Sequence, residues 1–139
     1  MRTKRSPARR LRLAILNDSP HVLKLLCDWF RRHGHQCATQ MVAEMPHAHV
    51  DVEQFIGEHR PDVVVYDVPM PYGSSWDLLD VIRSMPSLRS IPFVITTRNK
   101  RKLEQVVGRT SVVEIAGQPE DLRRLLKAVE AAGTSAPAK

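Results

Sequence analysis

Short apolar runs alternate along the chain with segments whose apolar residues recur at helical spacing. The runs cover residues 11–16, 36–42, 62–66, 91–96 and 111–116. Apolar runs of this length are typical of strands that are buried on both faces of a parallel sheet. The run at 62–66, DVVVY, is the strongest of them, rich in β-branched residues and apolar on both faces. We therefore expect it to lie at the centre of the sheet.

A helical pattern follows each predicted strand. Apolar residues at spacings of three and four predict helices over 20–33, 52–59, 76–82, 103–107 and 122–129. Ser19 before Pro20 is typical of an N-cap followed by proline at the first helical position. Five strand–helix units predict an α/β fold with a doubly wound, five-stranded parallel sheet and helices on both faces.

The 139 residues predict one domain over 11–132, between a basic arm at 1–10 and a flexible tail at 133–139. The net charge is +6, and residues 1–12 contain six Lys or Arg and no acid. Such an arm either contacts nucleic-acid phosphates or is a solvated, disordered leader. Aromatic residues are only 5% of the chain and do not interleave with the arm. We therefore expect a disordered arm and no nucleic-acid binding.

No apolar stretch is long enough for a membrane helix, and the N-terminus lacks the apolar core of a secretory signal. We expect a cytoplasmic protein without a membrane partner. Cys27 and Cys37 lack CxxC spacing, so we expect both to be reduced packing residues. Only the short tail follows the last predicted helix, which predicts no output domain and an output that passes through another molecule.

Polar residues follow the predicted strands where the chain leaves the sheet. These residues are Asn17 and Asp18 after the first strand, Asp67 after the third, Thr97 after the fourth and Gln118 after the fifth. Carboxyl ends of parallel strands meet at one edge of the sheet, where chemistry collects. A carboxylate at the end of a buried strand is costly unless its charge is used. Asp67 is therefore either the reactive group of this edge or merely an aspartate exposed where the strand ends.

Four segments together resemble the receiver domain of two-component response regulators, of the chemotaxis-regulator kind, over residues 11–132. The segments are ILNDSP at 15–20, PDVVVYDVPMP at 61–71, IPFVITT at 91–97 and GQPEDL at 117–122. Each segment alone is a weak signal, but their combined spacing is specific to this family. The resemblance implies a flavodoxin-like (βα)5 fold with strand order 2-1-3-4-5. It also implies phosphoryl transfer from a histidine kinase or a phosphotransfer protein to a carboxylate of this chain.

The resemblance also assigns roles to the residues at the predicted edge. Asp67 is the phosphoacceptor and Thr97 is the hydroxyl that senses the phosphoryl group. Mg²⁺ is the cofactor, because a divalent cation screens the charge between a carboxylate and a phosphoryl dianion. Its expected ligands are Asp18, Asp67 and the backbone carbonyl of Pro69, with Asn17 acting through a water. Asn17 and Asp18 could instead serve only the start of the first helix.

Several positions depart from the family pattern and predict a degenerate phosphorylation pocket. Gln118 stands where the family has lysine, Asn17 where it has an acid, and Ile115 where it has an aromatic switch residue. Gln118 donates a neutral hydrogen bond, which is weaker than the charged one it replaces. Arg98 follows Thr97 in place of a small residue and is either solvated or turned inward as a substitute cation. The resemblance further implies a cis peptide bond between Gln118 and Pro119.

These observations predict a stand-alone receiver domain that signals through protein–protein contacts and is not an enzyme. The glycines are too scattered for a dinucleotide or phosphate loop, and a dehalogenase-type phosphohydrolase would need an acid at Pro69. The rival interpretation is a pseudo-receiver, which has the same fold but binds proteins without phosphorylation. The lost lysine, acid and aromatic residue favour this rival.

The expected docking surface is the face made by the fourth helix, fifth strand and fifth helix. Lys100, Arg101 and Lys102 make a compact positive patch at the start of the fourth helix, with Arg98 at its edge. This patch predicts an acidic protein partner that is steered electrostatically. The alternative is that the patch only keeps an exposed helix in solution. A homodimer stays open.

Overall fold

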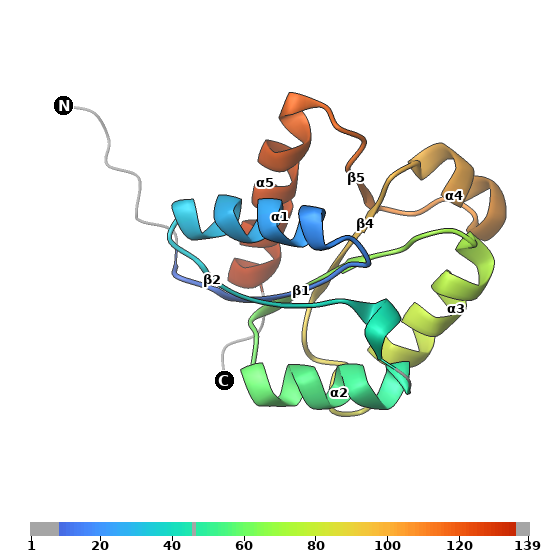
Figure 1. Ribbon diagram of the computed structural model, residues 1–139, viewed down its shortest axis with the longest axis horizontal. Helices are drawn as coiled ribbons and strands as arrows, with labels where there is room; N and C mark the ends of the chain where they lie inside the picture. The colour runs from blue at the N-terminus through green and yellow to red at the C-terminus, as the bar shows by residue number, and fades with distance from the viewer. Residues whose placement is uncertain (1–8, 46, 136–139) are drawn as a thin grey trace.

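The computed structural model describes residues 9–45 and 47–135 and contains a five-stranded parallel sheet of order β2-β1-β3-β4-β5 (Figure 1). The strands are β1 (Arg12–Leu16), β2 (Gln36–Gln40), β3 (Val63–Asp67), β4 (Phe93–Thr97) and β5 (Val113–Glu114). The α-helices are α1 (Pro20–Arg32), α2 (Ala48–His59), α3 (Tyr72–Arg83), α4 (Lys100–Val107) and α5 (Pro119–Ser135). A short 3-10 helix spans Val42–Glu44. The predicted fold and strand order are confirmed.

Two apolar layers hold the sheet between its helices. Helices α1 and α5 pack on one face, where Phe30 and Leu125 are fully buried against the sheet. Helices α2, α3 and α4 pack on the other face through side chains such as Ile56, Leu79 and Leu103. Figure 1 shows the sheet nearly edge-on, with α1 and α5 above it and α2 below. Strands buried on both faces explain the continuous apolar runs of the sequence.

Strand β3 lies at the centre, as predicted. It pairs with β1 on one side and with β4 on the other, and the side chains of Val63, Val64, Val65 and Tyr66 are buried. Burial of a Val side chain stabilises the fold by about 1.5–3 kcal/mol, so this strand is a large part of the core. Edge strand β5 is shorter than the predicted run at 111–116 and pairs only through Val113 and Glu114.

Helix boundaries agree with the capping signals at α1 and differ at α5. Ser19 is the N-cap of α1, and its side-chain oxygen accepts a hydrogen bond from the Val22 N–H at 3.2 Å. Helix α5 continues to Ser135, beyond the predicted boundary at 132. The rest of the predicted tail, 136–139, and most of the predicted arm, 1–8, lie outside the described residues. Within the described parts of the chain, no helix is long and apolar enough to cross a membrane.

The prediction of a cis bond at Gln118–Pro119 is wrong. Within residues 9–45 and 47–135 the cis peptide bond joins Met70 to Pro71. Pro119 is instead the first residue of α5, a position that suits trans proline because its fixed φ is already helical. Gly117, with φ of 101°, makes the turn that precedes it.

Candidate functional site

The carboxyl edge of the sheet brings together side chains from three neighbouring strands. Asp67 is the last residue of β3, Asp18 follows β1, and Thr96 and Arg98 lie at the end of β4. In Figure 1 this edge faces right, between the start of α1 and helices α3 and α4. Parallel pairing places all three strand ends at the same level, with Asp67 opposite Thr96. The polar edge that the sequence predicts therefore exists.

Asp67 is partly buried and keeps one carboxylate oxygen free. Its Oδ1 accepts a hydrogen bond from the Thr96 hydroxyl at 2.8 Å. No buried side-chain oxygen or nitrogen of the described residues lacks a hydrogen-bond partner, and no partner of Oδ2 is found among those residues. Oδ2 is therefore reachable from solvent. A partly buried carboxylate with one oxygen held and one open can both keep its orientation and react.

Burial raises the pKa of Asp67 from 3.8 to about 6. Loss of hydration disfavours the charged carboxylate and is the largest cause. The hydrogen bond from Thr96 and the positive charge of Arg98 act in the opposite direction, and the negative charge of Asp18 adds to the rise in pKa. Asp67 is thus a carboxylate whose charge the protein leaves undercompensated, as is common at functional sites.

Thr96, and not the Thr97 to which the family resemblance assigns the sensing role, provides the hydroxyl that contacts Asp67. Thr97 is fully buried, and its hydroxyl donates to the backbone carbonyl of Val68 at 3.0 Å. Successive side chains of a strand point to opposite faces, and the register pairs Asp67 with Thr96. Thr96 therefore shares the face of Asp67, whereas Thr97 lies on the other. Whether either hydroxyl senses a phosphoryl group stays a prediction.

Asp18 and Asn17 have different environments, although they are neighbours. Asp18 is exposed, and its Oδ1 accepts a hydrogen bond from the Ala43 N–H at 2.8 Å. Its charge raises the pKa of Asp67, so the two carboxylates lie within electrostatic reach of each other. Asn17 is buried, and its Oδ1 accepts from the Ser19 N–H at 2.9 Å. Asn17 thus serves the start of α1, which was one of the two predicted alternatives.

Gln118 lies in the turn before α5, and its side chain is exposed. Its backbone N–H donates to the carboxylate of Asp121 at 2.9 Å. No hydrogen bond between the Gln118 side chain and Asp67 is found in the described residues. Ile115 is half-buried and packs against the α1–α5 side of the core. The two substituted family positions therefore supply no cation and no mobile aromatic ring to the edge.

The oxygen atoms near Asp67 suit a hard divalent cation, although few of them are charged. Among the residues described, no group of three or more His, Cys, Asp or Glu side chains is arranged to hold a metal ion. Asp18 and Asp67 supply two carboxylates, each with one oxygen that the contacts above do not use. Mg²⁺ commonly binds through one or two carboxylates and keeps several waters. The residues present therefore fit Mg²⁺, with the carbonyl of Pro69 on the loop that follows Asp67.

Arg98 is the cation of this edge. It is exposed, and its positive charge acts on the pKa of Asp67. None of the ion pairs found in the described residues includes Arg98. The sequence left two alternatives for Arg98, solvated or turned inward as a substitute cation; its side chain is exposed, and no hydrogen bond or ion pair joins it to Asp67 in the described residues. The guanidinium is accessible to solvent and is also electrostatically coupled to Asp67.

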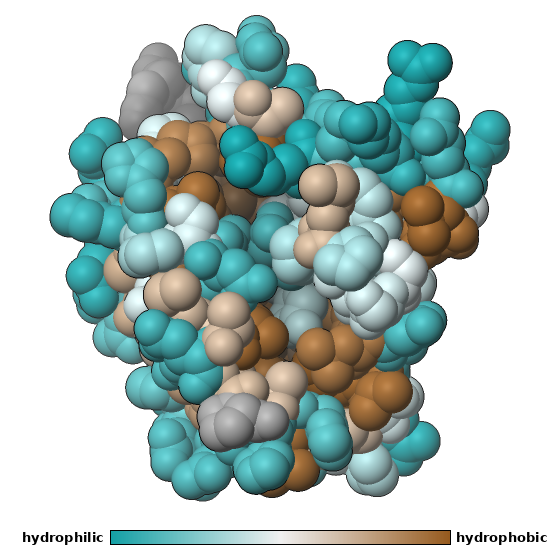
Figure 2. Space-filling view, turned by 45° about the vertical axis from the view of Figure 1, so that its right-hand side comes forward, coloured by the Kyte–Doolittle hydropathy of each residue, from teal (hydrophilic) through white to brown (hydrophobic). Residues whose placement is uncertain are grey.

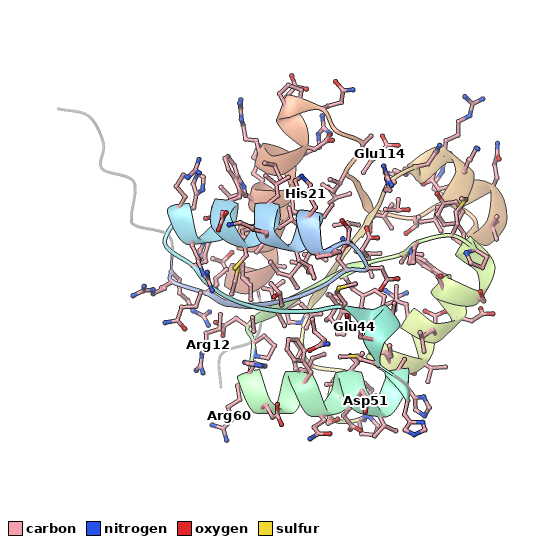
Figure 3. The ribbon with its side chains drawn as sticks, viewed as in Figure 1. Arg12, His21, Glu44, Asp51, Arg60 and Glu114 are labelled. Carbon is pink, nitrogen blue, oxygen red and sulfur yellow. The ribbon has the colours of Figure 1, made fainter. Side chains whose placement is uncertain are left out.

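A pocket of the protein lies elsewhere. It has a volume of about 460 Å³ and is lined by Arg60, Ser87 and Ile91 among others, at the amino edge of the sheet. Figure 3 labels Arg60 at the end of α2, far from the edge that carries Glu114. None of its lining residues belongs to the Asp67 site. The Asp67 site therefore lies apart from this pocket.

Sequence reasoning missed two contacts of the site. The family motif assigns its role to the second threonine of the pair at 96–97, so it gives no signal for Thr96. Aligning the ends of the two strands, which pairs Asp67 with Thr96, would identify it. The Ala43 N–H that binds Asp18 carries no sequence signal, because any residue can supply a backbone donor.

Comparison with known proteins agrees with this geometry. The chain is 27% identical to Protein PilH of Pseudomonas aeruginosa over 121 residues, which is 86% of this chain and 95% of that protein. A sensor protein from Polaromonas sp. JS666 matches with TM-score 0.72 at 17% identity, covering 93% of this chain and 100% of that chain. The chemotaxis response regulator CheY4 of Vibrio cholerae matches with TM-score 0.63 at 18% identity, covering 87% and 99%. No protein-family model matches the chain.

The chain has the fold of response-regulator receiver domains. Strand order, helix placement and the near-complete coverage of CheY4 all support this assignment. The resemblance predicted from the sequence is confirmed, and it extends through nearly all of the described residues. Degeneracy of the phosphorylation pocket stays a prediction.

Proposed function

We propose that this chain is a receiver-type signalling domain that accepts a phosphoryl group on Asp67 from a histidine kinase or phosphotransfer protein. One observation carries the proposal: at the carboxyl end of the central strand, Asp67 is held by Thr96 and keeps an accessible oxygen beside Asp18. The domain signals through protein–protein contacts and is not itself an enzyme. A cytoplasmic location belongs to the same proposal.

The reaction needs Asp67 in its ionised form. An oxygen of the Asp67 carboxylate attacks phosphorus, an O–P bond forms, and the P–N bond to the donor histidine breaks as that nitrogen takes up a proton. The Thr96 hydroxyl donates to Oδ1 and so keeps the carboxylate oriented while Oδ2 attacks. Because the carboxylate is fixed by the strand end, little reorganisation is needed before the in-line approach.

Asp18, Asp67 and the carbonyl of Pro69 would hold Mg²⁺. When bound, the cation supplies positive charge that offsets repulsion between the carboxylates and the incoming phosphoryl oxygens. The protein's part is to keep Asp18 in place through its hydrogen bond from the Ala43 N–H. Asn17 would contribute through a water only by giving up its bond to the Ser19 N–H, so it is the weakest member of the set.

Phosphorylation from acetyl phosphate tests the proposal directly. With Mg²⁺ present, intact-mass spectrometry should show one added phosphoryl group, and peptide mapping should place it on Asp67. Asp67→Asn should abolish the adduct, while Asp62→Asn, a change at the other end of β3, should not. An adduct that persists in Asp67→Asn would overturn the assignment of the acceptor.

The pKa of Asp67 predicts how the reaction depends on pH. With a pKa of about 6, half of the Asp67 carboxyl groups are protonated at that pH, and the protonated form is not a nucleophile. At a low Mg²⁺ concentration the initial rate of adduct formation should therefore rise between about pH 5 and pH 7. Higher Mg²⁺ should move the midpoint downward, because the cation favours the ionised carboxylate.

A pseudo-receiver is the second candidate, favoured by the exposed Gln118 side chain and by the Asn17 bond to Ser19. Such a protein would bind its partner identically with or without phosphodonor. Failure to form an adduct with acetyl phosphate, with phosphoramidate and with a cognate kinase would establish this candidate and remove the first.

The output partner is proposed to be an acidic protein surface that docks on α4 and α5. Arg101 and Lys102 are exposed and form no ion pair in the described residues. The acids of this face are engaged internally: Glu114 accepts from the Lys100 N–H at 3.0 Å, and Glu104 accepts from the Thr110 N–H at 3.0 Å.

The side chains of Arg101 and Lys102 therefore present positive charge that no ion pair of the described residues holds. Figure 2 shows hydrophilic side chains gathered at the upper right, over α4, and Figure 3 labels Glu114 beside that helix. Reversing Lys100, Arg101 and Lys102 to glutamate should slow association with the partner and reduce the dependence of the on-rate on salt. Association rates unchanged from wild type would show that the partner docks on another face.

A further inference from the structure

Exposed arginines gather at the amino edge of the sheet, at the end of the molecule opposite the candidate site. They are Arg10 and Arg12 at the start of β1, Arg31 and Arg32 at the end of α1, and Arg60 directly after α2. The parallel sheet brings them together, because its strands begin and helices α1 and α2 end at this edge. Figure 1 shows the end of α1 beside the starts of β1 and β2, and in Figure 3 Arg12 and Arg60 project outward at the same end.

Two contacts join the segments that carry these arginines. Arg12, Gln36 and His59 line one hollow of about 90 Å³, which connects the starts of β1 and β2 to the end of α2. The Arg31 side chain donates to the Cys37 carbonyl at 3.4 Å, which holds the end of α1 against β2. The three segments are therefore neighbours in space, although they are distant in the sequence.

Few acids offset the charge of this edge. None of its five exposed arginines takes part in an ion pair of the described residues. Asp62 is occupied by Arg9 at 2.8 Å, and Glu130 is hydrogen-bonded to His35 at 2.9 Å. Glu58, in the last turn of α2, adds one negative charge. The edge therefore keeps an excess of positive charge.

The basic arm of the sequence joins the described residues at this same edge. The description begins at Arg9, whose side chain donates to the Gly133 carbonyl at 3.2 Å. The eight residues before it contain Arg2, Lys4 and Arg5 and no acid. Positive charge from the arm and from the edge can therefore act on one ligand.

The composition of the edge favours phosphates over a protein or a membrane. All five of its exposed cations are arginines, whose forked N–H donors match phosphate oxygens. Protein interfaces commonly have an apolar centre and membrane-binding surfaces insert apolar side chains, whereas nucleic-acid interfaces are polar and strongly positive. None of the exposed large hydrophobic residues of the described chain belongs to the three arginine segments; they are Leu25, Val50, Met70, Val81 and Val106.

We propose that the amino edge binds the phosphate backbone of double-stranded nucleic acid through its exposed arginines, which are Arg10, Arg12, Arg31, Arg32 and Arg60. This inference goes beyond the proposed function and does not rest on it, because it involves no residue of the candidate site. Guanidinium groups displace the counterions of the phosphates they contact, so the binding depends strongly on salt and not on base sequence.

A duplex fits this edge better than a single strand does. The sequence prediction of no nucleic-acid binding came from the lack of aromatic residues in the arm, and single strands are the ligands that need aromatic side chains for stacking. Residues 9–13, 31–36 and 58–62 also contain no Trp, Tyr or Phe. The bases of a duplex stay stacked on each other, so phosphate contacts are enough to hold it.

Binding of a random-sequence DNA duplex of about 20 base pairs tests the proposal by fluorescence anisotropy over a series of salt concentrations. The logarithm of the binding constant should fall linearly with the logarithm of the salt concentration. Five to eight cations from the edge and the arm predict a slope of about −4 to −7. A single strand of equal length should bind more weakly.

Two double variants with the same net charge locate the site. Arg12→Gln with Arg60→Gln should weaken duplex binding at about 50 mM salt by about tenfold or more and make the slope shallower by about 2. The matched control is Arg101→Gln with Arg123→Gln, two exposed arginines on α4 and α5 that form no ion pair in the described residues. It should keep the affinity within about threefold of wild type. Urea denaturation should give both variants the stability of wild type.

The outcomes that would overturn the proposal are distinct. Equal weakening in both double variants would show that only net charge matters and that the amino edge is not the site. No duplex binding by wild type at about 50 mM salt would also overturn it. Tighter binding of poly-L-glutamate or of vesicles with anionic phospholipid would assign the edge to a protein or to a membrane. Should Arg12→Gln with Arg60→Gln be unstable, Arg10→Gln with Arg32→Gln makes the same test. Phosphorylation of Asp67 is unaffected by each of these outcomes.

Discussion

Asp67 and Asp121 are both shielded carboxylates, yet the protein treats them in opposite ways. Asp121 is 3% exposed, and its Oδ2 accepts three backbone N–H bonds, from Ala116, Gly117 and Gln118, at 2.8–2.9 Å. Burial alone would raise the pKa of Asp121, but these bonds and the charge of Arg124 lower it below 3.8. The pKa of Asp67, with one hydrogen bond, is raised to about 6.

The contrast separates a carboxylate that holds the fold from one that is held ready. Around Asp121 the charge is fully used to close the turn before α5, so ionisation stabilises the native state. At the β3 end the charge is undercompensated, so ionisation costs stability until a cation arrives. Asp62, just before the other end of β3, resembles Asp121, because it pairs with Arg9 at 2.8 Å and accepts from the Arg12 N–H.

Replacing His35 should lower the free energy of unfolding the most, because this residue at the amino edge is buried and both of its ring nitrogens form hydrogen bonds. The Leu11 N–H donates to His35 Nδ1 at 3.1 Å, so Nε2 carries the proton and donates to Glu130 at 2.9 Å. His35→Ala would leave a buried N–H without an acceptor and open a cavity. We expect the free energy of unfolding to fall by about 2–4 kcal/mol in urea denaturation. A loss under 0.5 kcal/mol would show that this contact is not structural.

Asp121→Ala should destabilise the fold by about 2 kcal/mol, since three turn amides lose a charged acceptor that water replaces only in part. The pKa of Asp121 is lowered in the folded state. Its contribution is therefore present above about pH 4 and is lost as the pH falls below that value. The difference in unfolding free energy between wild type and Asp121→Ala should shrink in acid. A constant difference from pH 7 to pH 2 would contradict the role of its charge.

Asp67→Asn should change the free energy of unfolding in the opposite direction and stabilise the fold. The folded-state pKa of about 6 exceeds the ordinary 3.8, so the folded state binds more protons in this window and loses stability as the pH rises through it. The neutral amide removes that loss. In metal-free buffer at pH 7.5 we expect a gain of about 1–2 kcal/mol, which disappears below about pH 4. If Asp67→Asn instead destabilises the protein at pH 7.5, the charge of Asp67 stabilises the fold, as that of Asp121 does, and the two carboxylates do not differ.

The smallest effect distinguishes the two threonines. Thr96→Val removes the hydroxyl that favours ionised Asp67, so the pKa of Asp67 should rise further. Thr97→Val changes a hydroxyl that bonds only to the Val68 carbonyl, and should leave that pKa near its wild-type value. Carboxyl-carbon NMR titrations of both variants measure the shifts. A larger shift in Thr97→Val would contradict the placement of the Thr96 hydroxyl beside Asp67.

The sequence predicted the five strands and the position of Asp67, because both depend on apolar runs and on where they end, whereas the strand order followed from the family resemblance. It did not predict the contact between Thr96 and Asp67, since that contact depends on the register of β3 with β4, and a shift of one residue moves a side chain to the opposite face. The hydrogen bonds of Asp121 depend on the turn at Gly117, where φ is 101°, and no pattern of residue types specifies that geometry.

A carboxyl-carbon NMR titration of the wild-type protein, without divalent metal, tests the contrast most directly. The account predicts that Asp67 titrates near pH 6 and Asp121 below its ordinary range. Added Mg²⁺ should lower the midpoint of Asp67 and leave that of Asp121 unchanged. An Asp67 midpoint at or below 4 in metal-free solution would contradict the claim that the end of the central strand holds an undercompensated, reactive carboxylate.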